Sequence, residues 1–233
     1  MNISREILSP AYHNLPYLPP KLETNPEKDF DFIKNGILDS KIEYFDELTI
    51  RYLETPHEIE KVKFLRQQIN LEIHSLLDSN FLINEQRRDE LGLTFCFELE
   101  GKTIGTIRFV PMKYGLTLTE SLLGETEYSN PILYENGWEV GRLVLDPNYR
   151  NEQDLLKKCL FSTLLYLYEN TNIQEFFASC THVLSRLYRR FGFSIIKKDV
   201  LLPRTEKNYT LIRGNACEIF KYLSVEKANE YLN

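Results

Sequence analysis

Residues 138–146 read Trp138-Glu139-Val140-Gly141-Arg142-Leu143-Val144-Leu145-Asp146, a strand pattern with two opposite charges inside an otherwise apolar run. Successive side chains of a strand point to opposite faces, so Glu139 and Gly141 share one face and Arg142 lies on the other. Glu139 and Arg142 therefore need separate partners, or a bulge between them, and Gly141 is where a bulge or the close approach of a ligand costs least. A buried carboxylate costs several kcal/mol unless it is paired, so we expect Glu139 to face a cation, a water-filled cleft or a substrate amine. The alternative is a core ion pair with no role in turnover.

A further lone cation, Arg108, lies in the preceding apolar run Gly105-Thr106-Ile107-Arg108-Phe109. Together with Arg66 on the first predicted helix, it offers positive charge near the same sheet. That charge would either clamp a carboxylate or orient Glu139. For Arg108, too, a structural salt bridge is the alternative.

Strand and helix patterns surround these runs. Residues 93–100 and 103–111 are β-rich on either side of Gly101-Lys102, which predicts a tight hairpin. Thr55-Pro56-His57-Glu58 combines a capping box with proline at the first helical position, so a helix is expected to begin there and to run to about Leu77. The other predicted strands are 48–54, 138–146, 173–180, 193–203 and 208–213, and the other helices are 155–167, 183–191 and 217–231.

The predicted order is β-α-β-β-(α)-β-α-β-α-β-β-α, in which the bracketed helix has no assigned bounds. This order favours a single α/β (α+β) domain over residues 49–233. Residues 1–48 contain five prolines and only weak periodicity, which indicates an extended or helical N-terminal arm.

The composition excludes several classes of function. With 28 Lys+Arg against 34 Asp+Glu, the formal net charge is −6, which excludes a generally basic nucleic-acid binder. No apolar run approaches the ~18 residues that cross a bilayer, and the first 20 residues do not resemble a secretion signal, so we expect a cytoplasmic protein without a transmembrane segment. The four cysteines form no C-x-x-C pair and the four histidines are scattered, so we expect free buried thiols and no metal site.

Charge is uneven along the chain. Residues 1–100 carry a net charge of −8, whereas residues 181–213 carry +6. This stretch could present a cationic surface to a phosphate-bearing or acidic partner, and a solvated helix face and sheet edge is the alternative. Its basic residues are Arg186, Arg189, Arg190, Lys197, Lys198, Arg204, Lys207 and Arg213.

Four short elements occur in a characteristic order. Leu65-Arg66 followed by Glu72, then Gly105-x-x-Arg108, then Trp138-Glu139-x-x-Arg142, resemble the L-R-x-x-V-(x)n-E, G-x-x-R and W-E-x-S-R elements of autoinducer synthases and N-acyl amino acid synthases. The stretch 187–193, Leu-Tyr-Arg-Arg-Phe-Gly-Phe, resembles the L-Y-x-x-x-G-F segment of GNAT-fold acyltransferases generally. Together these elements cover about residues 50–213. The resemblance implies a GNAT-like three-layer fold, in which helices flank a central mixed, mostly antiparallel sheet with a V-shaped splay between two strands.

The resemblance implies an N-acyltransferase that moves a fatty acyl group from a thioester to the amine of an amino acid or a related small metabolite. The acyl chain would lie between the splayed strands 138–146 and 173–180. Glu139 would accept the proton of the attacking amine, directly or through water, and Tyr188 would protonate the departing thiolate, unless it is simply a core tyrosine. The backbone N–H groups that would stabilise the oxyanion are those of Leu143, Val144 and Leu145.

The same resemblance implies how the small acceptor is held. Arg142 and Arg108 would bind a substrate carboxylate in charge-assisted pairs, which would select an amino acid over a simple amine. Arg66 and Trp138 would line the same site.

Departures from the pattern bear on the donor. Most acetyl-CoA-dependent members carry an R/Q-x-x-G-x-G/A turn that binds pyrophosphate, but residues 150–155 here contain no glycine and include Glu152 and Asp154. Acyl carrier protein presents its phosphopantetheine on an acidic helix, which suits a basic surface formed by Arg186, Arg189, Arg190, Lys197 and Lys198. We therefore expect acyl-phosphopantetheine on acyl carrier protein, rather than acyl-CoA, as the donor substrate, and no bound cofactor.

Two further departures concern the acceptor side. Gly141 replaces the serine of the lactone-synthase pattern, which argues against homoserine-lactone chemistry. The acidic pair that those synthases carry before the hairpin is approximated by Asp89 and Glu90.

Three alternatives stay open on the sequence. A ping-pong route would use Cys180, with His182 nearby in sequence. A CoA-dependent GNAT acetyltransferase would use the ordinary donor. A non-catalytic GNAT-like module would bind a protein partner with its basic face, and Glu139 and Arg142 would then pair in the core.

Overall fold

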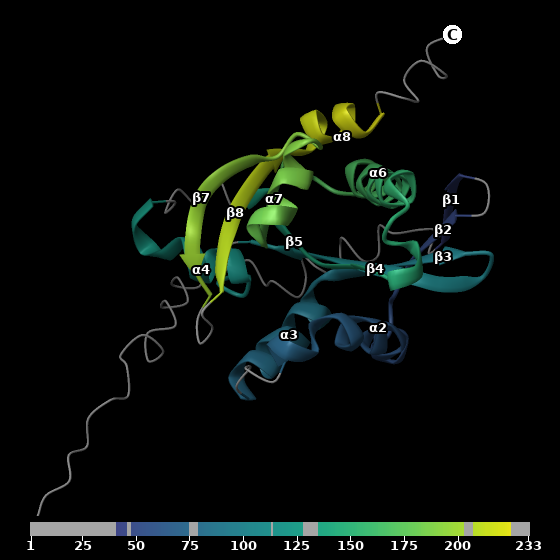
Figure 1. Ribbon diagram of the computed structural model, residues 1–233, viewed down its shortest axis with the longest axis horizontal. Coiled ribbons are helices and arrows are strands. Elements are labelled where there is room, and N and C mark those ends of the chain that lie inside the picture. The colour runs from purple at the N-terminus through teal and green to yellow at the C-terminus, as the bar shows by residue number, and fades with distance from the viewer. Residues whose placement is uncertain are drawn as a thin grey trace, which may run out of the picture.

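One mixed sheet runs through the described chain, which comprises residues 41–45, 48–74, 79–112, 114–127, 135–202 and 207–224 of this computed structural model. Within these residues the sheet has eight strands in the order β1-β2-β3-β4-β5-β6-β8-β7 (Figure 1). The strands are β1 (Lys41–Phe45), β2 (Leu48–Tyr52), β3 (Leu93–Leu99), β4 (Lys102–Pro111), β5 (Gly137–Leu145), β6 (Glu175–Cys180), β7 (Ser194–Leu201) and β8 (Asn208–Asn215). The helices are α2 (Pro56–His74), α3 (Ser79–Leu91), α4 (Leu118–Glu127), the short 3-10 helix η2 (Pro147–Tyr149), α6 (Gln153–Asn170), α7 (His182–Arg189) and α8 (Ala216–Ser224).

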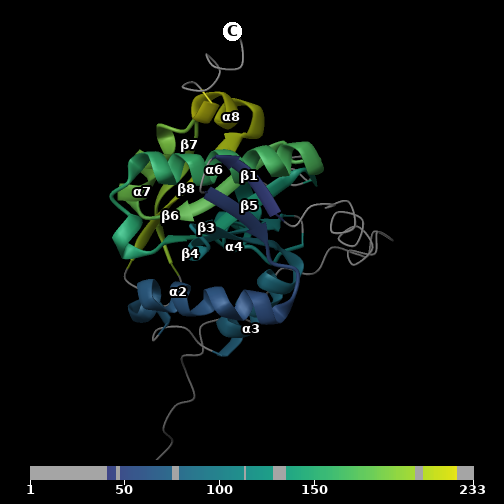
Figure 2. The same cartoon turned by 90° about the vertical axis from the view of Figure 1, so that its right-hand side faces the viewer.

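Helices cover both faces of the sheet, which makes three layers. In Figures 1 and 2, α6 and α8 lie on one side and α2 and α3 on the other. Alternation along β6 places α7 and α4 as well: Ala178 packs in a cluster with Tyr188 of α7, whereas Phe177 packs with Leu123 of α4. Helix α4 therefore lies on the face opposite α7, and the predicted three-layer α/β fold is confirmed.

The two central strands diverge. β5 and β6 are parallel neighbours, and their pairing covers only Gly137–Glu139 against Glu175–Phe177. Beyond Phe177, β6 continues in antiparallel register with β8 as far as Cys180, and β5 continues with β4 as far as Leu145. The predicted V-shaped splay is thus present, and Glu139 is the last β5 residue paired with β6.

Local sequence signals account for two of the element boundaries. The backbone N–H of Glu58 donates to Thr55 Oγ1 (3.3 Å), and Glu58 Oε2 accepts from the backbone N–H of Thr55 (3.1 Å), so the predicted capping box starts α2. The β3–β4 turn consists of Glu100 and Gly101, with φ values of 50° and 77°. The hairpin is therefore confirmed, with its turn one residue earlier than Gly101-Lys102.

Besides the short η2, two elements were not predicted. Helix α3 buries charged side chains such as Arg88 rather than an apolar stripe, so the usual 3.6-residue apolar period is missing from its sequence. Strand β1 lies in the range assigned to the arm and pairs antiparallel with β2. Residues 1–40 lie outside the described residues, as do 225–233 of the predicted last helix, and the division at residue 48 stays a prediction.

An aromatic core joins strands β3, β4 and β6 to α6. Phe95 packs edge-on against Phe109 and Tyr166, and Phe109 contacts Phe176 at a centroid distance of 5.9 Å. Fully burying such a side chain contributes about 1.5–3 kcal/mol.

No helix in the described residues is long and apolar enough to span a membrane.

Candidate active site

A bulge in β5 sets the geometry of the site. Arg108 of β4 pairs with Gly141, and Thr106 pairs with Val144, so Arg142 and Leu143 together oppose a single β4 residue. Arg142 itself has a φ of 52°, in the left-handed region. The bulge breaks the two-residue alternation and turns Arg142 to the face that α3 covers, where it binds Glu85. The sequence left separate partners or a bulge near Gly141 open; the strand has a bulge at Arg142 and Leu143, one residue after Gly141, and Arg142 is not on the face that simple alternation assigned to it.

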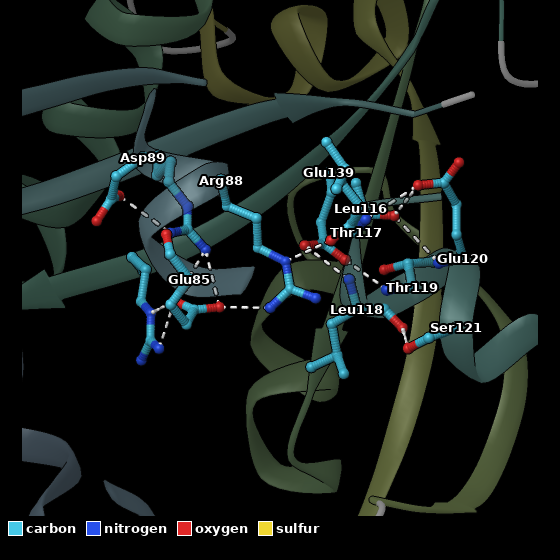
Figure 3. Close-up of polar contacts among 12 residues, drawn as sticks. Glu85, Arg88, Asp89, Leu116, Thr117, Leu118, Thr119, Glu120, Ser121 and Glu139 are labelled. Atoms are coloured by element: carbon cyan, nitrogen blue, oxygen red, sulfur yellow. Dashed lines mark hydrogen bonds and ion pairs between the residues drawn. The ribbon is translucent and has the colours of Figure 1, made fainter. Parts of the chain in front are cut away.

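Glu139 is buried and points at the start of α4. Its exposed fraction is 5%, and its carboxylate accepts the backbone N–H groups of Leu118 (3.3 Å) and Thr119 (2.5 Å) (Figure 3). A helix N-terminus favours a negative charge at this place. From the sequence, a cation, a water-filled cleft or a substrate amine was expected at Glu139. Its hydrogen-bond partners are the N–H groups of a helix whose start was not predicted, and, against the effect of burial, its charge also helps to raise the pKa of Arg108.

The first turn of α4 bridges the two splayed strands. Thr117 and Glu120 form a second capping box, in which the backbone N–H of Glu120 donates to Thr117 Oγ1 (3.1 Å) and Thr117 Oγ1 donates to Glu120 Oε2 (2.7 Å). The hydroxyl of Thr119 lies 3.0 Å from that of Ser179 on β6. Glu139 on β5 and Ser179 on β6 are thus connected through one helix turn.

An arginine cluster occupies the same face of the sheet beside α3. Glu85 accepts from Arg108 and from Arg142, whose Nε lies 2.7 Å from Glu85 Oε2. Asp89, one helical turn later, accepts from Arg66 (2.8 Å) and Arg108 (3.0 Å). The cluster consists of Arg66, Arg88, Arg108, Arg142, Glu85 and Asp89.

Arg88 connects this cluster to the α4 turn. Its guanidinium binds Glu85, and its Nε donates to the carbonyl of Leu116 (2.5 Å), just before the Thr117 cap (Figure 3). The segment that carries the partners of Glu139 is therefore anchored to α3 by a buried charge.

Burial and the neighbouring charges together shift the pKa values of Arg66 and Glu85. Burial lowers the pKa of Arg66 to about 10, and the charges of Arg108 and Arg142 act in the same direction. Burial opposes ionisation of Glu85, but Arg108, Arg142 and Arg88 together hold the pKa of this carboxyl well below its usual range. Glu85 is therefore ionised in the folded chain.

The acidic pair of the site is Glu85 and Asp89. Asp89 was a candidate from the sequence together with Glu90, which is exposed and accepts a hydrogen bond from Gln86. Residues i and i+4 share a helix face, so recognising α3 as a helix would have pointed to Glu85 as the partner of Asp89.

Of the three predicted substrate-binding arginines, Arg142 is the most open. The side chains of Arg66 and Arg108 are 6% and 3% exposed, and their Nη groups bind Glu85, Asp89 and Thr106. Arg142 is 16% exposed and holds Glu85 through Nε and Nη2, which leaves Nη1 without a partner in the described part of the chain.

Gly141, the residue before Arg142, leaves free space on this face of β5. A Cβ placed on Gly141 would meet just one described atom outside its chain neighbours within 4 Å, Arg108 Nη2 at 4.0 Å. Glu139, two residues earlier on the same strand, faces the same side as Gly141. The face of β5 that carries Glu139 and Arg142 therefore has room at Gly141. Trp138, in contrast, is buried in the main core on the other face.

The strand edge predicted to stabilise an oxyanion lies in the splay. Pairing with β6 ends at Glu139, so N–H groups of Leu143 to Leu145 that point toward β6 have no strand partner on that side. The far end of β5 is fixed because Arg150 Nε donates to the carbonyl of Leu145 (3.1 Å).

Tyr188 lies on the other face, at the edge of the apolar cluster of Ala178, Cys180 and Ile212. It packs against Phe193 at 5.7 Å, and its hydroxyl has no hydrogen-bond partner in the described residues. Burial raises the pKa of Tyr188. Tyr188 is therefore a protonated phenol, as a proton donor requires.

Cys180 does not have the surroundings of an activated thiol. It is buried, burial raises its pKa to about 12, and its Sγ donates to the carbonyl of Thr210. His182 is exposed and lies next to Arg186 instead. Of the other cysteines, Cys96 and Cys159 are buried as expected and Cys217 is exposed.

We expect Cys180→Ala to keep acyl transfer within about twofold of the wild-type rate, since a route through this thiol needs a thiolate. Steady-state assay of purified protein checks this. A loss of more than about tenfold in a folded Cys180→Ala protein would show that the thiol takes part.

The remaining sequence candidates lie on the surface. Arg186, Arg189 and Arg190 of the α7 segment and Lys197 and Lys198 of β7 are all exposed. Within the described residues, no group of three or more His, Cys, Asp or Glu side chains could hold a metal ion.

Comparisons with known proteins identify the family and the fold. Residues 64–215, more than half of the 233-residue chain, match the family model described as N-acyl amino acid synthase FeeM. The structure of FeeM, an N-acyl amino acid synthase from uncultured soil microbes, superimposes with a TM-score of 0.58 at 15% identity, covering 74% of this chain and 92% of that one.

Other solved structures share the fold. An uncharacterized protein from Bacillus halodurans gives a TM-score of 0.57 at 15% identity over 82% of this chain and 97% of its own. Spermidine N-acetyltransferase from Vibrio cholerae, solved with CoA and spermine, gives 0.50 at 13% identity over 75% and 99%. No curated protein matches the sequence.

Proposed function

The chain belongs to the FeeM family of N-acyl amino acid synthases and is an acyltransferase, and we propose that it transfers a fatty acyl group from the thioester of acyl carrier protein to the amine of an amino acid. The observation that carries this proposal is the open Nη1 of Arg142 beside the space at Gly141 and the carboxylate of Glu139. A guanidinium edge is suited to a carboxylate, and the anion of Glu139 is suited to an ammonium group. An amino acid carries both groups on one carbon.

The charge balance of the site supports an anionic acceptor. Four guanidinium groups of the arginine cluster face the carboxylates of Glu85, Asp89 and Glu139 in the described residues. The carboxylate of an amino acid bound beside this cluster would be stabilised by its guanidinium groups.

The proposed reaction is a direct attack. The amine nitrogen forms a bond to the thioester carbonyl carbon while Glu139 accepts the amine proton. The developing oxyanion is stabilised by N–H groups of β5 in the splay. The C–S bond then breaks, and the phenol of Tyr188 gives its proton to the departing thiolate, so that an amide and a free phosphopantetheine thiol are formed.

Two features of the surface favour acyl carrier protein as the donor. The N-terminus of α6, where pyrophosphate would bind in a CoA-dependent enzyme, carries Glu152 as N-cap and Asp154 in its first turn. Exposed cations gather instead on α7, together with the exposed apolar side chains Val183 and Leu184. A mixed basic and apolar surface is complementary to an acidic amphipathic helix.

A CoA-dependent acetyltransferase is the second candidate because of one observation on α6. Its N-cap residue Glu152 makes no side-chain hydrogen bond to the first turn, so the N-terminal N–H groups are not capped from within. Uncapped N–H groups can bind a phosphate.

A donor comparison separates the two candidates. We expect dodecanoyl-acyl carrier protein to be used with a kcat/KM at least about a hundredfold above dodecanoyl-CoA or acetyl-CoA. The triple variant R186E/R189E/R190E should raise KM for the acyl carrier protein about tenfold or more and leave turnover of dodecanoyl-pantetheine unchanged. Lys61→Glu, an exposed charge reversal on α2, is the matched control. Equal use of the CoA thioesters, insensitive to the triple variant, would favour the acetyltransferase.

A further inference from the structure

Tyr209 lies where the central strands are furthest apart. The next residue of β8, Thr210, pairs with Cys180, which is the last residue of β6. Tyr209 itself pairs only with Val200 of β7. Its side chain therefore stands beyond the end of β6, next to the open side of the splay.

Alternation along β8 gives the face on which Tyr209 lies. Leu211, two residues later, packs with Phe177, Met112 and Leu123 of α4. Side chains two residues apart share a face, so Tyr209 points to the α4 side of the sheet. This is also the side on which Glu139 and Arg142 lie.

Tyr209 lies within electrostatic reach of Arg142. Burial raises the pKa of Tyr209, and the positive charge of Arg142 opposes that rise. The ring is half-buried, and the hydroxyl has no hydrogen-bond partner in the described residues. The face of the sheet that carries Arg142 and its unpartnered Nη1 therefore also carries an unpartnered hydroxyl, at the open end of the splay.

We propose that Tyr209 completes the acceptor site by donating a hydrogen bond from its hydroxyl to the carboxylate that Arg142 binds. This inference rests on the proposed function, because it concerns the same acceptor. The carboxylate would lie between Arg142 of β5 and Tyr209 of β8, with the amine directed along β5 to Glu139. Tyr209 would then be a residue that selects amino acids over amines of the same shape.

Tyr209→Phe tests this role because it removes only the hydroxyl. Its matched control is Tyr222→Phe on α8, where the ring is exposed. With saturating dodecanoyl-acyl carrier protein, Tyr209→Phe should raise KM for the best amino acid about tenfold and change kcat less than about twofold. KM for the amine that lacks the carboxylate should not change.

Product binding provides a readout that is independent of the donor. By calorimetry, Tyr209→Phe should weaken N-dodecanoylglycine about tenfold and leave the affinity for its primary amide unchanged. If the wild type binds N-dodecanoylglycine and Tyr209→Phe binds it equally well, the role of Tyr209 is refuted while the proposed function stands. If the wild type neither acylates amino acids nor binds the product, the proposed function is refuted, and the role of Tyr209 is refuted as well.

Discussion

Glu139→Gln is expected to lower kcat by about 10²- to 10⁴-fold, which is the usual contribution of a general base. A glutamine side chain occupies the same volume but cannot accept the proton of the attacking amine. The variant should still fold, because its amide oxygen can accept one of the two backbone N–H groups that the carboxylate now binds. Steady-state kinetics with acyl carrier protein thioester, together with circular dichroism, measures both outcomes.

Glu139→Gln needs a control, because Glu139 also accepts hydrogen bonds from the N-terminus of α4. Thr117→Ala removes the other cap of the same helix and does not touch Glu139. Loss of a cap costs about 0.5–2 kcal/mol of stability, so Thr117→Ala should be less stable but keep kcat within about tenfold of the wild type. If the two variants lose activity equally, Glu139 acts by positioning α4 and not as a base.

Glu85→Gln is expected to destabilise the protein by about 3–5 kcal/mol, which is the cost of leaving buried charges without their partner. Glu85 holds Arg88, Arg108 and Arg142 together, and its side chain is only 14% exposed. Urea denaturation followed by tryptophan fluorescence would report the change. Glu98→Gln, which breaks the more exposed pair with Arg51, should cost about 1 kcal/mol or less.

The contribution of Glu85 to the stability of the protein depends on pH. Its pKa is lowered on folding, so its stabilising contribution is fully present above the pKa of an unfolded glutamate, about 4.3, and is lost as pH falls below that value. The difference in stability between wild type and Glu85→Gln should therefore be constant near neutral pH and shrink in acid. A difference that grows on acidification would contradict the pairing of Glu85 in the folded state.

Much of the sheet could be predicted from the sequence because its signals are local. The capping box at Thr55, the turn at Gly101 and the alternation in β5 each depend on residues within a few positions. The bulge could be anticipated for a similar reason: Glu139 and Arg142 are three residues apart in one strand, and both need partners.

The partners themselves could not be predicted, because α3 has no apolar stripe and the start of α4 was not recognised in the sequence. Helix α3 turns Glu85 and Asp89 toward the sheet, so its inward face appears polar in the sequence. The start of α4 follows an irregular stretch, and only the fold brings Thr119 to Glu139. The pairing of Glu139 with Arg142 that a non-catalytic module would show is not found among the described contacts, since each has a partner from a different helix.

Mass spectrometry of lipids from cells that overproduce the chain tests most directly whether this site joins an acyl chain to an amino acid. We predict a new set of ions, each with the mass of a fatty acid plus an amino acid less one water, that disappears with Glu139→Gln and persists with Thr117→Ala. Extracts identical to those of cells lacking the protein, or the same new ions from Glu139→Gln, would contradict the central role of Glu139 and the open edge of Arg142.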